Sequence, residues 1–385
     1  MRFALFGADA ESCLLAQSAA DLGHEIVWYG DVANVDRATH PWLAEADQGD
    51  EWEVLYDSQF CDFCIVGQGE APAALRIEQL IQIVKNGLAT ITTFPLTESV
   101  LSYYEVDMAR SESNVVLYHF NPLVTRTNRI EEFAEWIANG HPQFGRIEQL
   151  ICERPSMVRS RESVMWHFPG DIELLDRIAG PLDRLGALGS PNTDAAYSAL
   201  SVQMLGKTQV PVRWSITPPD QTQFPSLTFV GSSGRVEFRF DANGLFMPGS
   251  DDSDFSPTAA PTACVKKFTE QLSDGTGPRT TWPSALRAME LTDTIEISLR
   301  RGRMIDVHRQ QLTEELSFRG TMSAVGCGVL LLLPPLLLLA SWIAELLGLP
   351  IANYWAHGLL ALLGLFLLFQ FAPKLLIKKP DRESQ

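Results

Sequence analysis

The chain has 385 residues, of which 46% are hydrophobic, and its formal net charge at pH 7 is −17. This length and composition allow at least two buried cores. The acidic balance argues against a nucleic-acid-binding protein, which needs a basic face.

Strands and helices alternate over the first part of the chain. Periodic segments predict helices at 11–23 and 76–87 and a further helix that ends near 110. Short apolar runs between them predict strands at 2–7, 25–31, 61–67, 89–93 and 115–120. Such alternation with short connections is typical of a parallel sheet covered on both faces. We therefore expect residues 1–123 to form an α/β, Rossmann-like, doubly wound nucleotide-binding domain.

The six cysteines are scattered and predict no disulfide framework. Cys61 and Cys64 form a CxxC, but residues three apart on an extended strand face opposite ways. This spacing favours two buried thiols over a shared metal or a redox pair.

Residues 124–318 follow a different pattern. Runs at 146–153, 198–205, 210–216, 226–231 and 234–240 read as strands separated by turn residues. Helices are expected at 130–140 and 171–180, and a closing helix at 283–302. The polar, proline-rich stretch 246–263 reads as a loop. This part predicts an α+β domain with a largely antiparallel sheet, one face of which is open.

Two apolar runs near the C-terminus, 324–347 and 351–372, each exceed the ~20 residues that cross a bilayer as a helix. The short turn between them predicts a two-helix membrane hairpin over 322–373, with a kink at Pro334-Pro335. Basic residues precede the hairpin and recur in the tail 374–385, while the turn has none. The positive-inside rule therefore predicts a multi-pass membrane protein with its large domain and tail in the cytoplasm.

Three stretches carry a resemblance to a known family: KNGLATITTFPLTES, YHFNPLVTRTNRIEEFAEWIANGHPQFGRIEQL and WPSALRAMELTDTIEISLRRGRMIDVH. With the order and spacing of the expected elements, they resemble the Gfo/Idh/MocA family, which includes glucose–fructose oxidoreductase and inositol dehydrogenase. The resemblance covers about residues 1–308 and leaves the hairpin as an addition. It implies a nicotinamide cofactor, hydride exchange with a sugar or cyclitol, and a homodimer formed through the open sheet.

The expected phosphate loop departs from the dinucleotide fingerprint GxGxxG. Its three glycine positions hold Gly7, Asp9 and Ser12. Asp9 adds a side chain and a negative charge where the pyrophosphate of a dinucleotide would lie. Asp31, after the second strand, is placed to hold ribose hydroxyls, which would favour NAD over NADP; a turn aspartate is the other interpretation. The full set of expected cofactor-binding residues is Gly7, Ala8, Asp9, Ala10, Asp31, Gly67, Thr93, Phe94 and Pro95.

Two catalytic positions of the resembled family also differ. Its Glu-Lys-Pro motif aligns with Thr93, Phe94 and Pro95, so phenylalanine stands where the proton-transferring lysine is expected. Phenylalanine cannot carry a proton, and general acid–base assistance is typically worth ~10²–10⁴ in rate. The family histidine aligns with Gly170, and the acid three residues later with Glu173.

Other polar residues are candidates for relocated chemistry. His167 and Tyr118 are the candidate acid–base groups, although a loop or partly buried histidine is the more ordinary interpretation of His167. The candidates for binding substrate are His119, Asn121, Arg154 and Arg159. A solvated basic turn is an alternative explanation of the two arginines.

The leading hypothesis is a membrane-anchored pseudoenzyme of the oxidoreductase type. It would bind a nucleotide or a sugar derivative, with little or no dehydrogenase activity. One alternative is an active NAD-dependent sugar or nucleotide-sugar oxidoreductase with relocated acid–base residues. A further alternative is a membrane scaffold or interaction protein. No metal site is expected.

Overall fold

The computed structural model describes residues 1–32, 40–57, 59–127, 129–189, 194–219, 224–241, 244–246, 258–275 and 279–307. All of them lie within one compact unit, Met1–Arg309. The expected membrane hairpin at 322–373 and the tail at 374–385 lie outside the described residues. Up to Val307, where the description ends, no helix is both long and apolar enough to cross a bilayer.

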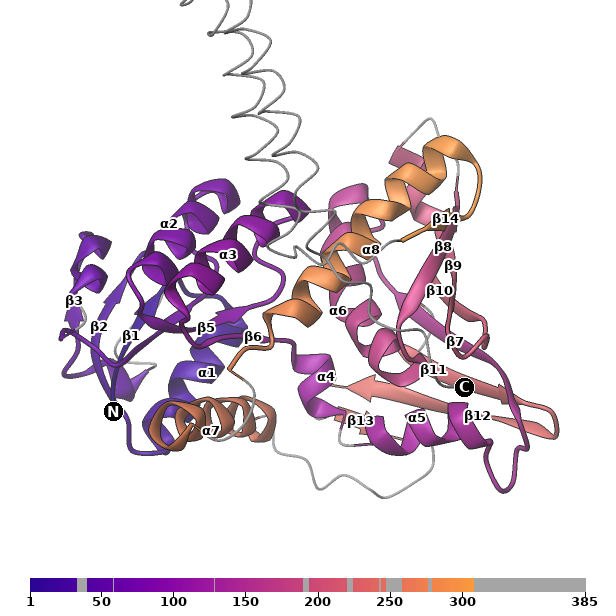
Figure 1. Ribbon diagram of the computed structural model, residues 1–385, viewed down its shortest axis with the longest axis horizontal. Helices are drawn as coiled ribbons and strands as arrows, with labels where there is room; N and C mark the ends of the chain where they lie inside the picture. Colours follow the sequence, from indigo (N-terminus) through magenta and orange to yellow (C-terminus); the bar gives the residue numbers. More distant parts are fainter. Residues whose placement is uncertain are drawn as a thin grey trace, which may run out of the picture. The chain divides into compact units, whose positions relative to one another are not determined.

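The first domain contains a six-stranded sheet of order β3-β2-β1-β4-β5-β6, in which every pairing is parallel (Figure 1). This is the expected doubly wound α/β arrangement. The strands are β1 (Arg2–Phe6), β2 (Glu25–Gly30), β3 (Asp47–Gln48), β4 (Phe63–Val66), β5 (Ala89–Thr93) and β6 (Leu117–Phe120). The helices between them are α1 (Ala10–Asp21), α2 (Ala73–Lys85) and α3 (Val100–Ser113), with short 3₁₀ turns at Pro41–Leu43 and Trp52–Tyr56.

The central strands of this sheet are buried on both faces because helices cover each side. All four residues of β4 and all five of β5 are buried. Cys61 and Cys64 are both buried and free, as expected, and burial raises the pKa of the Cys61 thiol to about 12.

Helix α7 (Ala259–Asp274) packs on the first domain although it follows the strands of the second in sequence. Its apolar side chains Val265 and Phe268 are fully buried in the first core. The expected loop at 246–263 is therefore wrong from Ala259 onward. The polar and proline-rich composition did not indicate a helix, because the apolar residues of α7 become buried only when the helix packs on α1.

The second domain contains an eight-stranded sheet of order β13-β12-β11-β7-β10-β9-β8-β14. Among the strands that the structure describes, only β7 and β10 pair in parallel; the other pairings are antiparallel, which agrees with the expected, largely antiparallel sheet. The strands are β7 (Ile147–Pro155), β8 (Leu182–Leu188), β9 (Ser201–Gly206), β10 (Val212–Thr217), β11 (Ser226–Gly231), β12 (Gly234–Asp241), β13 (Gly244–Phe246) and β14 (Ile305–Asp306).

The helices of this domain are α4 (Pro122–Arg126), α5 (Ile130–Asn139) and α6 (Arg161–Ala179), with a 3₁₀ turn at Asp194–Ala199. Helix α6 begins ten residues before the expected start at 171, because Ser160 caps it by accepting a hydrogen bond from Ser163 N–H. Pro169 lies inside the helix. As a result His167 and Gly170 are helical residues and do not belong to a loop.

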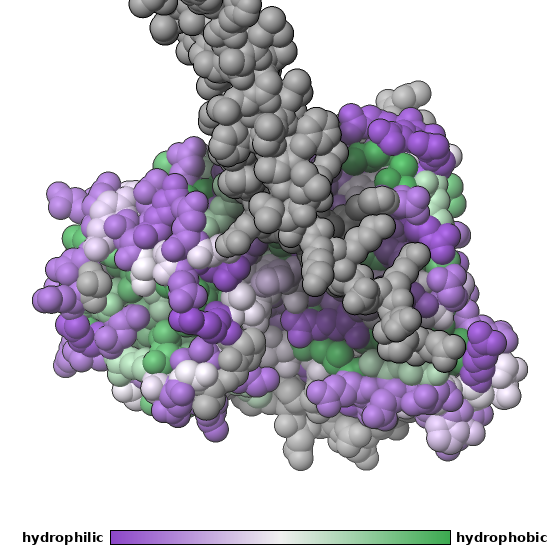
Figure 2. Space-filling view, in the orientation of Figure 1, coloured by the Kyte–Doolittle hydropathy of each residue, from purple (hydrophilic) through white to green (hydrophobic). Residues whose placement is uncertain are grey.

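Helix α8 (Trp282–Arg301) takes part in both hydrophobic cores (Figure 1). Trp282 and Ala285 are buried in the first core, and Leu291 and Ile295 in the second. This helix therefore holds the two domains together. On the face shown in Figure 2, hydrophilic residues predominate and hydrophobic residues form small separate patches.

Candidate functional site

Most of the expected cofactor-binding residues meet at one edge of the first sheet. Gly7 follows β1, Asp31 follows β2, Gly67 follows β4, and the Thr93-Phe94-Pro95 segment ends β5. Because carboxyl ends of parallel strands lie at one edge of a sheet, ligands of such folds bind there. We call this group of residues the carboxyl edge.

The loops after β1 and β4 approach each other closely. Gly7 has φ +78°, and a Cβ built on it would lie 2.4 Å from the carbonyl oxygen of Gly67. A Cβ on Gly67 would lie 2.4 Å from Ser12 Oγ. Only glycine fits these two positions without displacing backbone or the first turn of α1.

Replacing Gly7 with alanine should destabilise the protein by at least ~2 kcal/mol, because positive φ and the clash with Gly67 act together. The matched control is Gly23→Ala. Gly23 has φ +83° but no atom within 4 Å of a built Cβ, so it reports the backbone strain alone. Chemical denaturation of both variants measures the difference. Equal losses of stability in Gly7→Ala and Gly23→Ala would show that the contact with Gly67 does not contribute to the loss.

The Asp9 carboxylate lies at the centre of the carboxyl edge. Its Oδ1 accepts a hydrogen bond from Ser12 N–H at 2.7 Å, which caps α1. Its Oδ2 accepts hydrogen bonds from Gln68 N–H and from the Thr93 hydroxyl, both at 2.8 Å. One side chain therefore connects the ends of β1, β4 and β5.

These contacts show how poorly the loop suits a dinucleotide. In the usual binding mode, N–H groups at the start of the first helix face the pyrophosphate. Here Asp9 already occupies the Ser12 and Gln68 N–H groups and brings its own negative charge. Gly7 fits the close approach of a phosphate, but Asp9 does not.

Asp31 is also engaged. Its carboxylate accepts hydrogen bonds from the Arg76 guanidinium and, at 3.4 Å, from Ala71 N–H. Arg76 is 1% exposed, and its guanidinium lies 3.9 Å over the ring of Phe6. Asp31 is therefore already paired with a buried arginine, and the expected preference for NAD over NADP stays a prediction.

Phe94 fills apolar space at the position where lysine was expected. It is half-buried, precedes a cis peptide bond to Pro95, and contacts Tyr103 and His119 edge-on. The ring centroids of Phe94 and His119 are 5.2 Å apart. Phe94 thus lies against the ring of His119.

His119 belongs to a buried polar network around Glu173. Glu173 Oε2 is 2.9 Å from His119 Nε2 and accepts a hydrogen bond of 2.9 Å from the Asn121 amide. Glu173 Oε1 accepts one of 2.8 Å from Arg177. On the other side of the imidazole, His119 Nδ1 is 2.8 Å from the Thr281 hydroxyl. The network joins β6, α6 and the start of α8, and so connects the two domains.

Glu173 is held in its ionised form. Burial raises its pKa, but His119, Arg177 and Asn121 outweigh burial and lower the pKa to about 2. With ionised Glu173 as acceptor, His119 Nε2–H donates to the carboxylate, and His119 Nδ1 pairs with the Thr281 hydroxyl. Both ring nitrogens then have partners within the protein.

The two candidate acid–base residues lie elsewhere. Tyr118 and His119 are consecutive on β6 and point to opposite faces, so Tyr118 packs on Phe268 of α7 and is 4% exposed. His167 lies six residues before Glu173 on α6, about 240° around the helix. Burial and the nearby Arg154 lower the pKa of His167. Neither side chain is part of the network around Glu173.

The expected substrate-binding arginines have structural partners. Arg154 forms a bidentate ion pair with Asp171, whose carboxylate also accepts a 2.8 Å hydrogen bond from the Trp214 indole. Arg159 donates to the Ser198 carbonyl at 2.6 Å. Neither a free anion clamp nor a solvated basic turn describes Arg154, which is partly buried and connects β7 with the buried Asp171 of α6.

Within the described part of the chain, no three His, Cys, Asp or Glu side chains are arranged to hold a metal ion. The sequence matches no family model, and it matches no curated protein. Solved structures, by contrast, show clear similarity of fold.

One of them is the WlbA dehydrogenase from Bordetella pertussis in complex with NADH and UDP-GlcNAcA. It is 18% identical, with a TM-score of 0.61 over 80% of this chain and 98% of that one. A myo-inositol dehydrogenase from Corynebacterium glutamicum is 16% identical, with a TM-score of 0.59 over 80% and 99%. GenD2 from gentamicin A biosynthesis, in complex with NAD, is 14% identical, with a TM-score of 0.62 over 80% and 96%. The described residues between 1 and 307 therefore share the fold of these dehydrogenases.

The sequence interpretation missed Arg76 and Thr281. For Arg76 a local signal existed: it lies four residues before Leu80 and seven before Ile83, on the buried stripe of α2. An arginine in such a stripe requires a buried acceptor. Thr281 precedes α8 with no local pattern that distinguishes it.

Proposed function

We propose that this chain is a membrane-anchored protein of the dehydrogenase fold with little or no hydride-transfer activity. It would bind a sugar derivative or a nucleotide at the carboxyl edge. The observation that carries the proposal is the Asp9 carboxylate, which occupies three donors at the place where a cofactor pyrophosphate would bind.

Two further observations support it. Phe94 has no proton to transfer and packs against His119. Gly170 contributes its carbonyl oxygen to the Asn121 amide at 3.0 Å and has no side chain to reach a substrate. The membrane anchor rests on the two apolar runs of the sequence, and a homodimer through the sheet of the second domain rests on the family resemblance.

One observation favours the alternative, an active NAD-dependent oxidoreductase for a sugar or nucleotide sugar. The imidazole of His119, paired with ionised Glu173, lies next to the position of the expected lysine. Its side chain is only 2% exposed, so proton transfer would require Phe94 to move.

The test is a calorimetric titration of the full-length chain in detergent micelles with NADH and NADPH. A parallel assay follows NADH oxidation in the presence of nucleotide sugars and inositols. We expect dissociation constants well above the micromolar range and no turnover. Micromolar binding together with turnover would establish the active oxidoreductase instead.

A further inference from the structure

Trp166 is a large aromatic side chain of α6 that belongs to neither hydrophobic core of the described residues. It is half-buried, whereas Phe168, Ile172 and Leu175 of the same helix are fully buried in the second core. Within the described part of the chain, the indole contacts no other aromatic ring and its N–H has no hydrogen-bond partner. An indole with an unused N–H and a partly open ring face is suited to contact a ligand.

The direction of the Trp166 side chain follows from the geometry of α6. Trp166, Gly170 and Glu173 lie within about 60° of one another around the helix. The Gly170 carbonyl accepts a hydrogen bond from the Asn121 amide at 3.0 Å, and Glu173 pairs with His119 of β6. Trp166 is therefore on the side of α6 that faces the first domain, one turn before Gly170.

Two contacts place this part of α6 along the carboxyl edge. Arg161, at the start of the helix, forms an ion pair of 2.7 Å with Glu98, which lies four residues after Phe94. Gly170 marks the second contact. Because Trp166 lies between Arg161 and Gly170, its indole belongs to the stretch of α6 that follows the ends of β5 and β6. Phe94, which is also half-buried, adds a second aromatic ring at this edge.

The charges at the carboxyl edge disfavour an anionic ligand. Asp9 caps α1, and Glu11 lies in its first turn. Among the described residues Glu11 Oε2 has no hydrogen-bond partner, and the Arg126 guanidinium is 3.9 Å away. These carboxylates repel a phosphate, whereas a hydroxyl group can donate to Glu11. A neutral ring that bears hydroxyl groups has such donors together with a flat carbon face, which packs on an aromatic ring.

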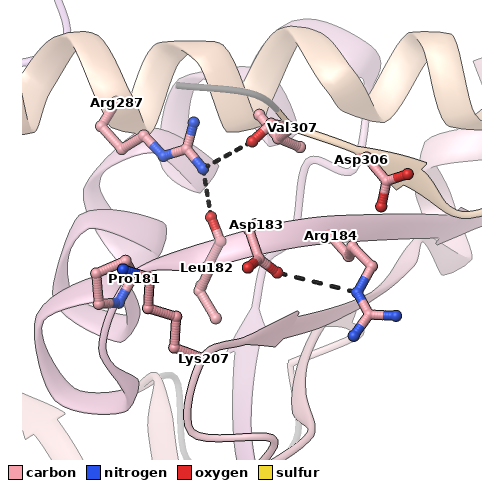
Figure 3. Close-up of a pocket in the computed structure, with 8 residues that line it drawn as sticks. All are labelled: Pro181, Leu182, Asp183, Arg184, Lys207, Arg287, Asp306 and Val307. Carbon is pink, nitrogen blue, oxygen red and sulfur yellow. Dashed lines mark hydrogen bonds and ion pairs between the residues drawn. The ribbon is translucent and has the colours of Figure 1, made fainter. Parts of the chain in front are cut away.

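The pocket beside β8 has no comparable surface. It has a volume of about 340 Å³, and none of the residues that line it is aromatic. Figure 3 shows that the Arg287 guanidinium donates hydrogen bonds to the carbonyl oxygens of Leu182 and Val307. These bonds satisfy backbone groups at the edge of the second sheet. The pocket therefore presents no ring on which a ligand could stack.

We propose that Trp166 determines ligand specificity at the carboxyl edge. Its indole packs on the carbon face of a neutral pyranose or cyclitol that carries no phosphate, and the indole N–H donates to a ring hydroxyl. This inference rests on the proposed function, since it requires a ligand at this edge. It assigns recognition to α6 of the second domain and not to the phosphate loop of the first.

The first test measures binding of methyl β-glucopyranoside and of myo-inositol to the full-length chain in detergent micelles by saturation-transfer difference NMR. Trp166→Ala should weaken binding of these rings about tenfold, because the stacked face and the indole N–H are both lost. Trp166→Phe should retain most of the binding, because the phenyl ring keeps a flat face.

Trp42→Ala is the matched control. Trp42 is a half-buried tryptophan in the turn before β3, the strand at the opposite end of the first sheet from β6, and its loss should change neither affinity. Thermal denaturation of each variant checks that it is folded. No saturable binding of either ring, or equal weakening by Trp166→Ala and Trp42→Ala, would overturn the proposal.

Two further probes separate this inference from the proposed function. Glucose 6-phosphate should bind at least about tenfold more weakly than methyl β-glucopyranoside, because its phosphate meets the carboxylates of α1. Binding of uridine monophosphate that Trp166→Ala leaves unchanged, without binding of the neutral rings, would overturn the role of Trp166 and leave the proposed function standing. Micromolar NADH binding with turnover would overturn the proposed function, and the neutral-ring titration of Trp166→Ala would still decide the role of Trp166.

Discussion

Replacing Asp9 with glycine should tighten NADH binding about thirty-fold. Two unit charges ~4 Å apart interact by ~4 kcal/mol at an effective dielectric near 20, and solvent at the half-buried loop reduces this to ~2 kcal/mol. The substitution removes that repulsion and frees Ser12 N–H and Gln68 N–H for a phosphate. Calorimetric titration of the full-length variant measures the change.

The same substitution should lower stability. It removes the cap of α1 and leaves the Gln68 N–H and the Thr93 hydroxyl without their acceptor, at a cost of ~1–3 kcal/mol. A substitution that raises the affinity for NADH while it lowers the stability of the protein indicates that the original side chain occupies the position of the ligand. NADH should then restore part of the lost stability of Asp9→Gly by mass action.

Asp21→Asn is the matched control for charge. Asp21 ends the same helix, is exposed, and its substitution changes the net charge by the same amount as Asp9→Gly. It should leave NADH affinity unchanged. If Asp9→Gly and Asp21→Asn bind NADH no better than the unmodified chain, Asp9 is not the group that limits cofactor binding.

Replacing Glu173 with glutamine should destabilise the protein by about 3 kcal/mol at neutral pH. The lowering of the Glu173 pKa from 4.5 to about 2 corresponds to this amount of stabilisation of the ionised form in the folded state. Glutamine carries no charge. Its amide NH2 group donates and cannot accept a hydrogen bond, so one of the three donors, His119, Asn121 or Arg177, loses its acceptor. Denaturant midpoints of both proteins at pH 7 measure the loss.

The effect should depend on pH in a definite direction. The folded-state pKa of Glu173 is lower than the unfolded one, so the unfolded chain takes up the proton first as pH falls. The stabilisation is complete above about pH 4.5 and is lost progressively toward pH 2. The difference between the two proteins should shrink over this window.

Glu162→Gln, an exposed glutamate in the first turn of the same helix, is the control and should change stability by less than ~0.5 kcal/mol. A stability difference for Glu173→Gln that stays constant from pH 7 to pH 3 would mean that the loss comes from packing and that the buried charge contributes nothing.

Much of the fold followed from local patterns. Apolar runs of four to six residues between amphipathic helices specify a parallel sheet, because a strand covered on both faces must be apolar throughout. Strand β8 was missed because Asp183, Arg184 and Gly186 interrupt its apolar positions. Helix α6 was shortened because Pro169 is ordinarily a boundary, whereas here the Ser160 cap starts the helix before it.

The sequence by itself determined the doubly wound domain, the second largely antiparallel sheet, and the departures at Asp9, Phe94 and Gly170 from the resembled family. It could not show what these side chains contact. Asp9 and Thr93 are 84 residues apart, His119 and Glu173 are 54 apart, and His119 and Thr281 are 162 apart. Residue type and local spacing set backbone conformation and the buried face of an element. The partner of a buried charge is set by which elements the two cores bring together. Only the tertiary structure decided that the polar residues of the carboxyl edge pair within that edge, and that the residues around Glu173 pair within their own network.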